Sequence, residues 1–93
     1  MAVVRRSRSD ELRASEVTAL RALFDAAWGD EMRGTPAEGF TDDDWDHARG
    51  GLHFVLEDGG GIISHASVVE RWLETGGHRL ATGYVEAVAT WPV

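Results

Sequence analysis

The C-terminal third of the sequence, "IISHASVVERWLETGGHRLATGYVEAVAT" at positions 62–90, contains two runs rich in β-branched residues, separated by a glycine pair. Such runs, bounded by glycine-rich turns, are typical of antiparallel strands joined by a hairpin. A third run, "LHFVLE" at 52–57, alternates in the same way and is followed by "DGGG" at 58–61, a second hairpin turn. The sequence therefore predicts a three-strand antiparallel meander over residues 52–90.

A helix is predicted in the N-terminal part. At 14–28, "ASEVTALRALFDAAW" repeats apolar residues at helical spacing. Ser15 is the candidate cap of its first turn, with Ser9 or Asp10 as an earlier alternative, and Gly29 or Gly34 is expected to end the helix. Before it, "AVVRRSR" at 2–8 is a short candidate strand with three arginines.

A second, shorter helix is predicted from "TDDDWDHARGG" at 41–51. Thr41 is a good N-cap, and Asp44 occupies the position from which a carboxylate reaches back to the cap's N–H group. The element order is then (β)ααβββ, an α+β fold in one domain spanning residues 1–93. Three tryptophans are expected in its core: Trp28, Trp45 and Trp72.

The charge of the chain is concentrated in one segment. The net charge is −7, and residues 25–46 carry eight acidic residues against one arginine. Such a field repels nucleic acid and attracts cations, although a solvated acidic surface is the simpler interpretation. No apolar run approaches the ~20 residues needed to span a membrane, and no secretory signal begins the chain. We therefore expect a cytoplasmic protein that binds neither nucleic acid nor membrane.

The histidines and glycine-rich segments do not have the spacing of metal or phosphate sites. No pair of the four histidines has the spacing of metal ligands on one helix, so no metal is expected, and His65 is expected to be a packed or hydrogen-bonded imidazole. The glycine-rich segments join strands and do not open helices, so they are turns and not phosphate-binding loops.

The last strand carries one carboxylate, Glu86, in an apolar setting. Alternation places it on one face with its neighbours Tyr84 and Val88. Without other information, a surface carboxylate or one paired to an arginine is the simpler interpretation. A sheet face covered by a helix would be a costly place for an unpaired carboxylate, whereas a face that opens onto a substrate cleft would not.

Three stretches resemble the N-terminal half of the aminoglycoside 2'-N-acetyltransferases, which are GNAT acetyltransferases: "FTDDDWDHARGGLH" (40–53), "GGIISHASVVER" (60–71) and "GYVEAVA" (83–89). The resemblance covers residues 40–90 in order. It implies the N-terminal half of a GNAT fold, with acetyl-CoA as co-substrate and an aminoglycoside or other polyamine as acceptor.

The resemblance also implies roles for individual residues. Glu86 matches the catalytic base, which removes a proton from the substrate ammonium and helps to bind the polycation. Asp44 matches an acidic position on the substrate side. A further acidic position of the family falls on a glycine here, with Glu38 one residue earlier as the remaining candidate. The backbone of Val88 matches the group that polarises the thioester, and Thr90 matches a further backbone contact of acetyl-CoA.

The sequence departs from the family after Thr90. The family continues there with a loop of the type Arg/Gln-x-x-Gly-x-Gly/Ala, which holds the CoA pyrophosphate. This chain has "TWPV" instead. The expectation is a partial GNAT domain that ends before this loop, a truncated form that is inactive by itself. The alternative is a non-catalytic module that binds cations or pairs through its last strand, for example as a homodimer.

Overall fold

The structure, a computed structural model, describes residues 2–32 and 41–92. The chain begins with strand β1 (Val3–Arg8), a 3₁₀ turn η1 (Ser9–Glu11) and helix α1 (Ala14–Met32). Helix α2 (Asp42–Ala48) and strands β2 (Leu52–Asp58), β3 (Gly61–Thr75) and β4 (His78–Thr90) follow. The predicted α+β class and the (β)ααβββ order are confirmed, and they are compatible with part of a GNAT fold.

All four strands belong to one antiparallel sheet in the order β1-β2-β3-β4, so the predicted three-strand meander continues into β1. Its two tight turns are glycine pairs, Gly59-Gly60 and Gly76-Gly77. All four glycines have positive φ, between 55° and 88°. Two consecutive positive φ values are what a two-residue hairpin turn of matching twist requires, which is why glycine occupies both positions.

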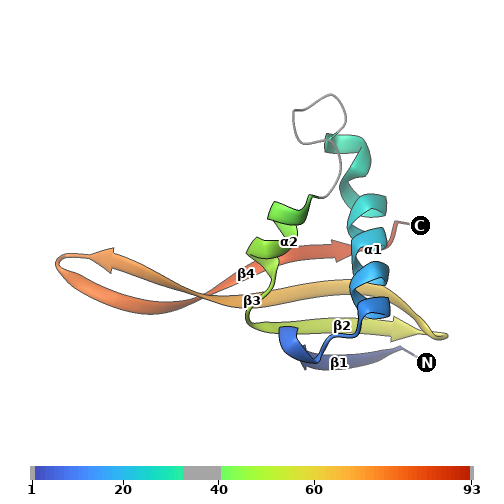
Figure 1. Ribbon diagram of the computed structural model, residues 1–93, viewed down its shortest axis with the longest axis horizontal. Helices are drawn as coiled ribbons and strands as arrows, with labels where there is room; N and C mark the ends of the chain where they lie inside the picture. The colour runs from blue at the N-terminus through green and yellow to red at the C-terminus, as the bar shows by residue number, and fades with distance from the viewer. Residues whose placement is uncertain (1, 33–40, 93) are drawn as a thin grey trace.

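Both helices lie on the same side of the sheet, where they pack against β3 and β4 (Figure 1). The core between the two layers is small and is built from Leu20, Leu23 and Phe24 of α1 together with Val55 of β2 and Ala89 of β4. Trp28 and Trp45 pack against it, and the ring of Phe24 stacks on Trp28 at 5.3 Å. The prediction that these two tryptophans belong to the core is confirmed.

Helix boundaries differ in part from those expected. The first helix starts at Ala14, so Ser15 lies inside it, and the Glu16 carboxylate instead accepts from the N–H of Arg13 just before the helix. The helix also continues through Gly29 to Met32, because a single glycine costs a helix only about 1 kcal/mol. Gly34 lies outside the described residues. The predicted start of α2 is confirmed in full, with Thr41 as its cap.

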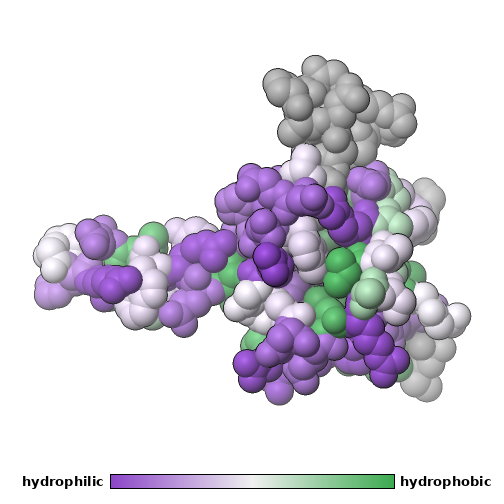
Figure 2. Space-filling model, viewed as in Figure 1, coloured by the Kyte–Doolittle hydropathy of each residue, from purple (hydrophilic) through white to green (hydrophobic). Residues whose placement is uncertain are grey.

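The β3–β4 hairpin is much longer than β1 and β2, and its outer part projects beyond the sheet (Figure 1). We call residues 72–81 the hairpin arm. On the face seen in Figure 2, hydrophilic residues dominate along the arm and over α2, and hydrophobic residues show beside α2. Trp72 lies on the arm and is 51% exposed, so the prediction that it belongs to the core is wrong. The preceding residue, Arg71, bonds to the His47 carbonyl of α2, so alternation places the Trp72 side chain on the face of the sheet away from the helices.

Candidate functional site

Glu86 lies on the helix-covered side of strand β4. Its pairing partner on β3 is Ser67, which is fully buried beneath the helices, and directly opposed residues share a face of the sheet. The Ser67 hydroxyl donates to the Glu86 backbone carbonyl at 3.2 Å. Glu86 itself is half-buried, and no hydrogen bond or ion pair joins its carboxylate to another residue within 2–32 and 41–92.

Along β4, Glu86 lies between the part of the strand near α2 and the part that packs against α1. On one side, Arg71 of β3 donates to the carbonyl of His47 at the end of α2, and Arg71 pairs with Thr82 of β4. On the other side, Ala89 belongs to the core cluster with the residues of α1. A carboxylate that is half-exposed, unpaired and placed on an edge strand between two helices can accept a proton or bind a cationic group.

Directly after Glu86 the strand contains a β-bulge. His65 pairs with Ala89 and Ser67 pairs with Glu86, so Ala87 and Val88 together oppose Ala66. Ala87 has a φ of 50°, a left-handed conformation that a non-glycine residue rarely adopts. An extra residue in one strand interrupts the alternation of side chains at that point.

The bulge corrects one prediction. Val88 does not share the face of Glu86: its neighbour Ala89 points into the core, and Val88 is 59% exposed and lines a hollow with Val4 and Leu56. These residues lie on the face of the sheet that faces away from the helices. The predicted alternation of side chains between the two faces holds from Leu80 to Glu86 and fails at Val88. One inserted residue shifts the alternation by one position, so Val88 points to the opposite face.

Asp44 holds the start of α2. Its carboxylate accepts from the Thr41 N–H at 2.9 Å, and the Thr41 hydroxyl accepts from the Asp44 N–H at 3.2 Å, which is a complete capping box. The neighbouring Asp42 pairs with Arg21 of α1. Asp44 therefore has the structural role that the sequence predicts, and its role in substrate binding stays a prediction. Glu38 lies outside the described residues.

Thr90, the second expected contact of acetyl-CoA, is exposed near the end of β4. Its hydroxyl lies 3.0 Å from that of Ser64 on β3. The structure thus brings Glu86, Val88 and Thr90 onto one short segment, with Glu86 on the helix side and Val88 on the other. No three histidine, aspartate or glutamate side chains form a candidate metal site within the described ranges. No helix among the residues searched is long and apolar enough to cross a membrane.

A buried polar cluster beneath Glu86 was missed by the sequence reasoning. Two histidines, His53 of β2 and His65 of β3, are almost fully buried and lie 2.9 Å apart between Nδ1 and Nε2. Their rings contact Trp45 and Phe24 respectively, at centroid distances of 5.7 and 5.2 Å. The expectation of a packed, hydrogen-bonded His65 is confirmed. The usable signal was His65 and Ser67 two positions apart in β3, since residues two apart in a strand share a face of the sheet.

Burial sets the protonation of this pair. Desolvation, together with the nearby His65, lowers the pKa of His53 from 6.5 to about 4. Desolvation also lowers the pKa of His65, and the hydrogen bond to the Ala87 carbonyl opposes that shift. Both imidazoles are therefore neutral at pH 7.

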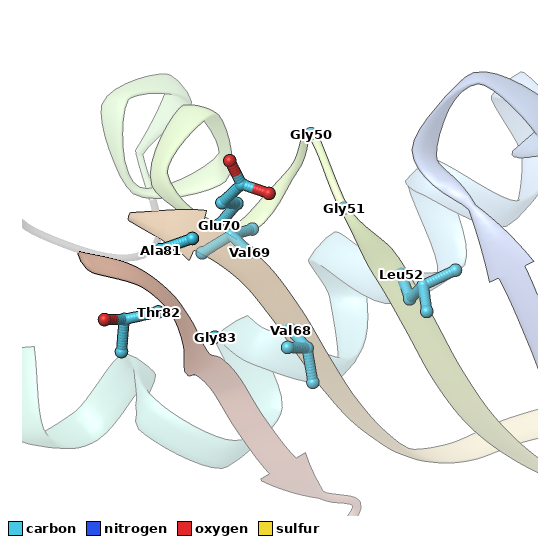
Figure 3. Close-up of a pocket in the computed structure, with 9 residues that line it drawn as sticks. All are labelled: Gly50, Gly51, Leu52, Val68, Val69, Glu70, Ala81, Thr82 and Gly83. Carbon is cyan, nitrogen blue, oxygen red and sulfur yellow. The ribbon is translucent and has the colours of Figure 1, made fainter. Parts of the chain in front are cut away.

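A shallow groove of about 400 Å³ lies between the loop that precedes β2 and the base of the hairpin arm (Figure 3). Two glycines shape it. A Cβ on Gly51 would stand 2.0 Å from the carbonyl oxygen of Val68, and one on Gly83 would stand 3.2 Å from the Val68 side chain. Glu70 is the one acidic residue among those lining the groove, and Glu86 is not among them. We therefore base the site on Glu86 and not on this groove.

Comparison with known proteins identifies a relative of named function. The chain is 50% identical over 50 residues to an aminoglycoside 2'-N-acetyltransferase of Mycolicibacterium fortuitum. The match covers 54% of this chain and 26% of that protein, so the chain matches about a quarter of the relative's length. The similarity confirms the resemblance that the sequence analysis identified. No protein-family model matches the chain.

Proposed function

We propose that this chain forms the acceptor side of an acetyltransferase that moves an acetyl group from acetyl-CoA to the 2'-amino group of an aminoglycoside. The observation that carries the proposal is the carboxylate of Glu86, half-buried and without a bonded partner among the described residues, beside the bulge of β4. The similarity to an aminoglycoside 2'-N-acetyltransferase over 50 residues supports this reaction class.

Glu86 acts as the base in this proposal. An amine attacks the thioester carbonyl carbon only after its ammonium form has lost a proton, and Glu86 accepts that proton directly or through one water. The new C–N bond then forms, the C–S bond breaks, and the sulfur leaves as the thiol of CoA after taking up a proton. The same carboxylate attracts the remaining ammonium groups of a polycationic acceptor.

The acceptor is held by acidic residues. The net charge of −7 and the three aspartates in the first turn of α2 create a field that attracts a polyamine. Because α2 packs against β3 and β4, this field lies on the same side of the sheet as Glu86. Asp44 is the proposed contact on α2. Glu38 is proposed on the resemblance alone.

The proposed place for acetyl-CoA is the outer edge of strand β4. Strand β4 is at one edge of the described sheet, so the far side of its backbone has no strand partner within residues 2–32 and 41–92. An extended pantetheine chain can pair there as an added strand, with the Val88 N–H directed at the thioester oxygen and Thr90 as a second backbone contact. A cytoplasmic location and the absence of nucleic-acid binding stay predictions.

Two measurements test the proposal on the 93-residue chain. The first is binding of a 2'-amino aminoglycoside, followed by NMR shifts of the Glu86 and Asp44 amides, with a 2'-hydroxyl analogue for comparison. The second is release of CoA thiol from acetyl-CoA with the same acceptor. We expect Glu86→Gln to lower any observed release by about 10²-fold or more, because the base is lost while the shape is kept.

Glu74→Gln is the matched control, because Glu74 is an exposed carboxylate on the hairpin arm. It should leave binding and release unchanged. Binding without release would support the acceptor role and restrict the chain to that side of the reaction. A folded chain that shows no binding and no release would reject the proposal. Release that is unaffected by Glu86→Gln would also reject it.

A second candidate, strand pairing without catalysis, is favoured by the same free edge. Val85 on β4 is 65% exposed, and an unpaired edge strand with apolar residues is a template for pairing with another chain. A homodimer joined through β4 would give a concentration-dependent mass in sedimentation. Val85→Lys should abolish that dependence, and a monomer at every concentration would exclude this candidate.

A further inference from the structure

A continuous chain of hydrogen bonds crosses the interior and ends at the bulge. The Gly50 N–H donates to the Ser9 hydroxyl oxygen at 2.8 Å, and Ser9 Oγ lies 2.6 Å from His53 Nε2. His53 Nδ1 lies 2.9 Å from His65 Nε2, and His65 Nδ1 lies 2.8 Å from the Ala87 carbonyl oxygen. These five residues come from the turn that follows β1, the loop that precedes β2, and strands β2, β3 and β4.

The direction of every bond follows from its last acceptor. A carbonyl oxygen can only accept, so His65 Nδ1 must carry the proton and donate to Ala87. A neutral imidazole has one N–H, so His65 Nε2 accepts from His53 Nδ1, and His53 Nε2 accepts from the Ser9 hydroxyl. Both histidines are thereby held in the Nδ1–H tautomer.

The chain ends on the one non-glycine residue with positive φ among those described, Ala87. This conformation persists only where surrounding contacts impose it. Within residues 2–32 and 41–92, the side-chain donor to the Ala87 carbonyl is His65 Nδ1–H, and His65 is only 2% exposed. A donor fixed in this way is suited to hold the peptide group after Ala87 in one orientation.

We propose that His65 is a positioning residue that sets the bulge of β4, with His53 and Ser9 fixing its tautomer. The bulge in turn separates Glu86 from Val88, one on the helix side and the other on the opposite face. Without it, strict alternation would place both side chains on one face. The consequence for acetyl transfer rests on the proposed function, whereas the effect on the bulge does not.

His65→Leu tests this directly, because leucine keeps the bulk and removes the donor. We expect loss of the cross-strand pairing between residues 65 and 89 in nuclear Overhauser spectra, loss of the positive φ of Ala87, and amide exchange at Val88 and Ala89 that is faster by about tenfold. His65→Asn places an N–H close to the position of Nδ1, so it should restore the pairing and most of the protection.

His78→Leu is the matched control, because His78 is exposed at the turn of the hairpin arm. It should leave the bulge unchanged. If His65→Leu keeps both the 65–89 pairing and the conformation of Ala87, the proposal is overturned. A result in which His65→Asn behaves as His65→Leu also overturns it, because the donor would then not be the deciding feature.

The wild-type chain provides a test that does not depend on whether a variant folds. Imidazole ¹⁵N spectra at pH 7 should show His53 and His65 both protonated at Nδ1 and both bare at Nε2. A proton on His65 Nε2 would overturn the proposal, because that tautomer cannot donate to Ala87. None of these readouts uses activity, so the proposal on His65 and the proposal on acetyl transfer can fail separately.

Discussion

The β3–β4 hairpin has two ends: the hairpin arm, residues 72–81, and the remainder of the two strands, residues 61–71 and 82–90, which we call the base. The two ends differ in almost every respect. From Ser67 outward, the pairing with β4 is regular up to the Gly76-Gly77 turn. At the base, the pairing of β3 is irregular on both sides: Ile63 of β3 is an additional residue opposite Leu56 and Glu57 of β2, and β4 has an additional residue at the bulge of Ala87. The base also contains Glu86 and the buried His65, whereas the arm carries exposed apolar residues.

The difference shows where the fold is determined. The arm is specified by turn chemistry and alternation, which act locally, and its outer part projects beyond the sheet (Figure 1). The base is determined by contacts between elements that are distant in sequence, namely the helices, the buried imidazoles and the bulge. Function is proposed at the base because bulges redirect side chains and are often found beside active sites.

The largest expected loss of stability comes from a substitution in the core between α1 and the sheet. Phe24→Ala should lower the free energy of unfolding by about 3–5 kcal/mol, because Phe24 is fully buried and contacts Trp28, Trp45 and His65. Urea unfolding measures the change, and Phe24→Leu, which leaves a smaller cavity, should cost clearly less. A loss below about 1 kcal/mol for the alanine variant would contradict a core centred on this ring.

The next largest loss of stability is expected from a backbone clash at Gly51. Gly51→Ala should cost about 2–4 kcal/mol, because its Cβ would lie 2.0 Å from a backbone oxygen of Val68, which cannot move without breaking the pairing of β2 with β3. Gly61→Ala is the control, since the nearest atom there is 4.0 Å away. Equal losses in thermal unfolding for the two variants would disprove the clash as the cause.

Much of the fold could be predicted from the sequence. The order of elements, both glycine-pair turns and the capping box of Thr41 and Asp44 depend on residues within a few positions of one another, where propensity and local hydrogen bonding decide. Of the two predicted ends of α1, Gly29 is excluded because the helix continues to Met32, and a single glycine is a weak stop signal when tertiary contacts hold the helix.

The site was predictable only in part, because its geometry depends on the two bulges. The turn at Gly59-Gly60 sets a register in which His53 and His65 would lie on opposite faces. Ile63 is the additional residue that reverses the phase and brings the two imidazoles together. The bulge at Ala87 does the same to Val88. No local pattern marks either insertion, so residue identities such as Glu86 could be proposed while their faces could not.

Low pH should destabilise the fold around the buried histidine pair. The pKa of His53 is about 4 in the folded chain and about 6.5 in the unfolded chain, so the unfolded state binds more protons between these values. Stability is therefore complete above pH 6.5 and is lost as the pH falls towards 4, by up to about 3 kcal/mol for His53. The lowered pKa of His65 adds to the loss in the same direction.

Urea unfolding at intervals from pH 7 to pH 4.5 measures this loss. Other charged groups around the pair act elsewhere: Arg5 of β1 is held by Glu16 of α1 and Glu57 of β2, and the lowered pKa of Glu16 affects stability only below about pH 4.5. His53→Gln should flatten the dependence, and an unchanged slope would show that His53 is not its source.

The smallest expected effect is in the arm. Trp72 is half-exposed, and its ring lies under the guanidinium of Arg79, 4.4 Å from the ring centroid, as a diagonal pair on one face of the ribbon. Because the arm projects beyond the sheet and half of Trp72 is exposed, Trp72→Ala should cost below about 1 kcal/mol of global stability. A double-mutant cycle with Arg79→Gln should give a coupling of about 0.5 kcal/mol, as expected for an exposed cation–π pair. A loss above 2 kcal/mol would mean that the arm contributes to the cooperative fold as strongly as the base does, and the contrast between the two ends of the hairpin would then have to be abandoned.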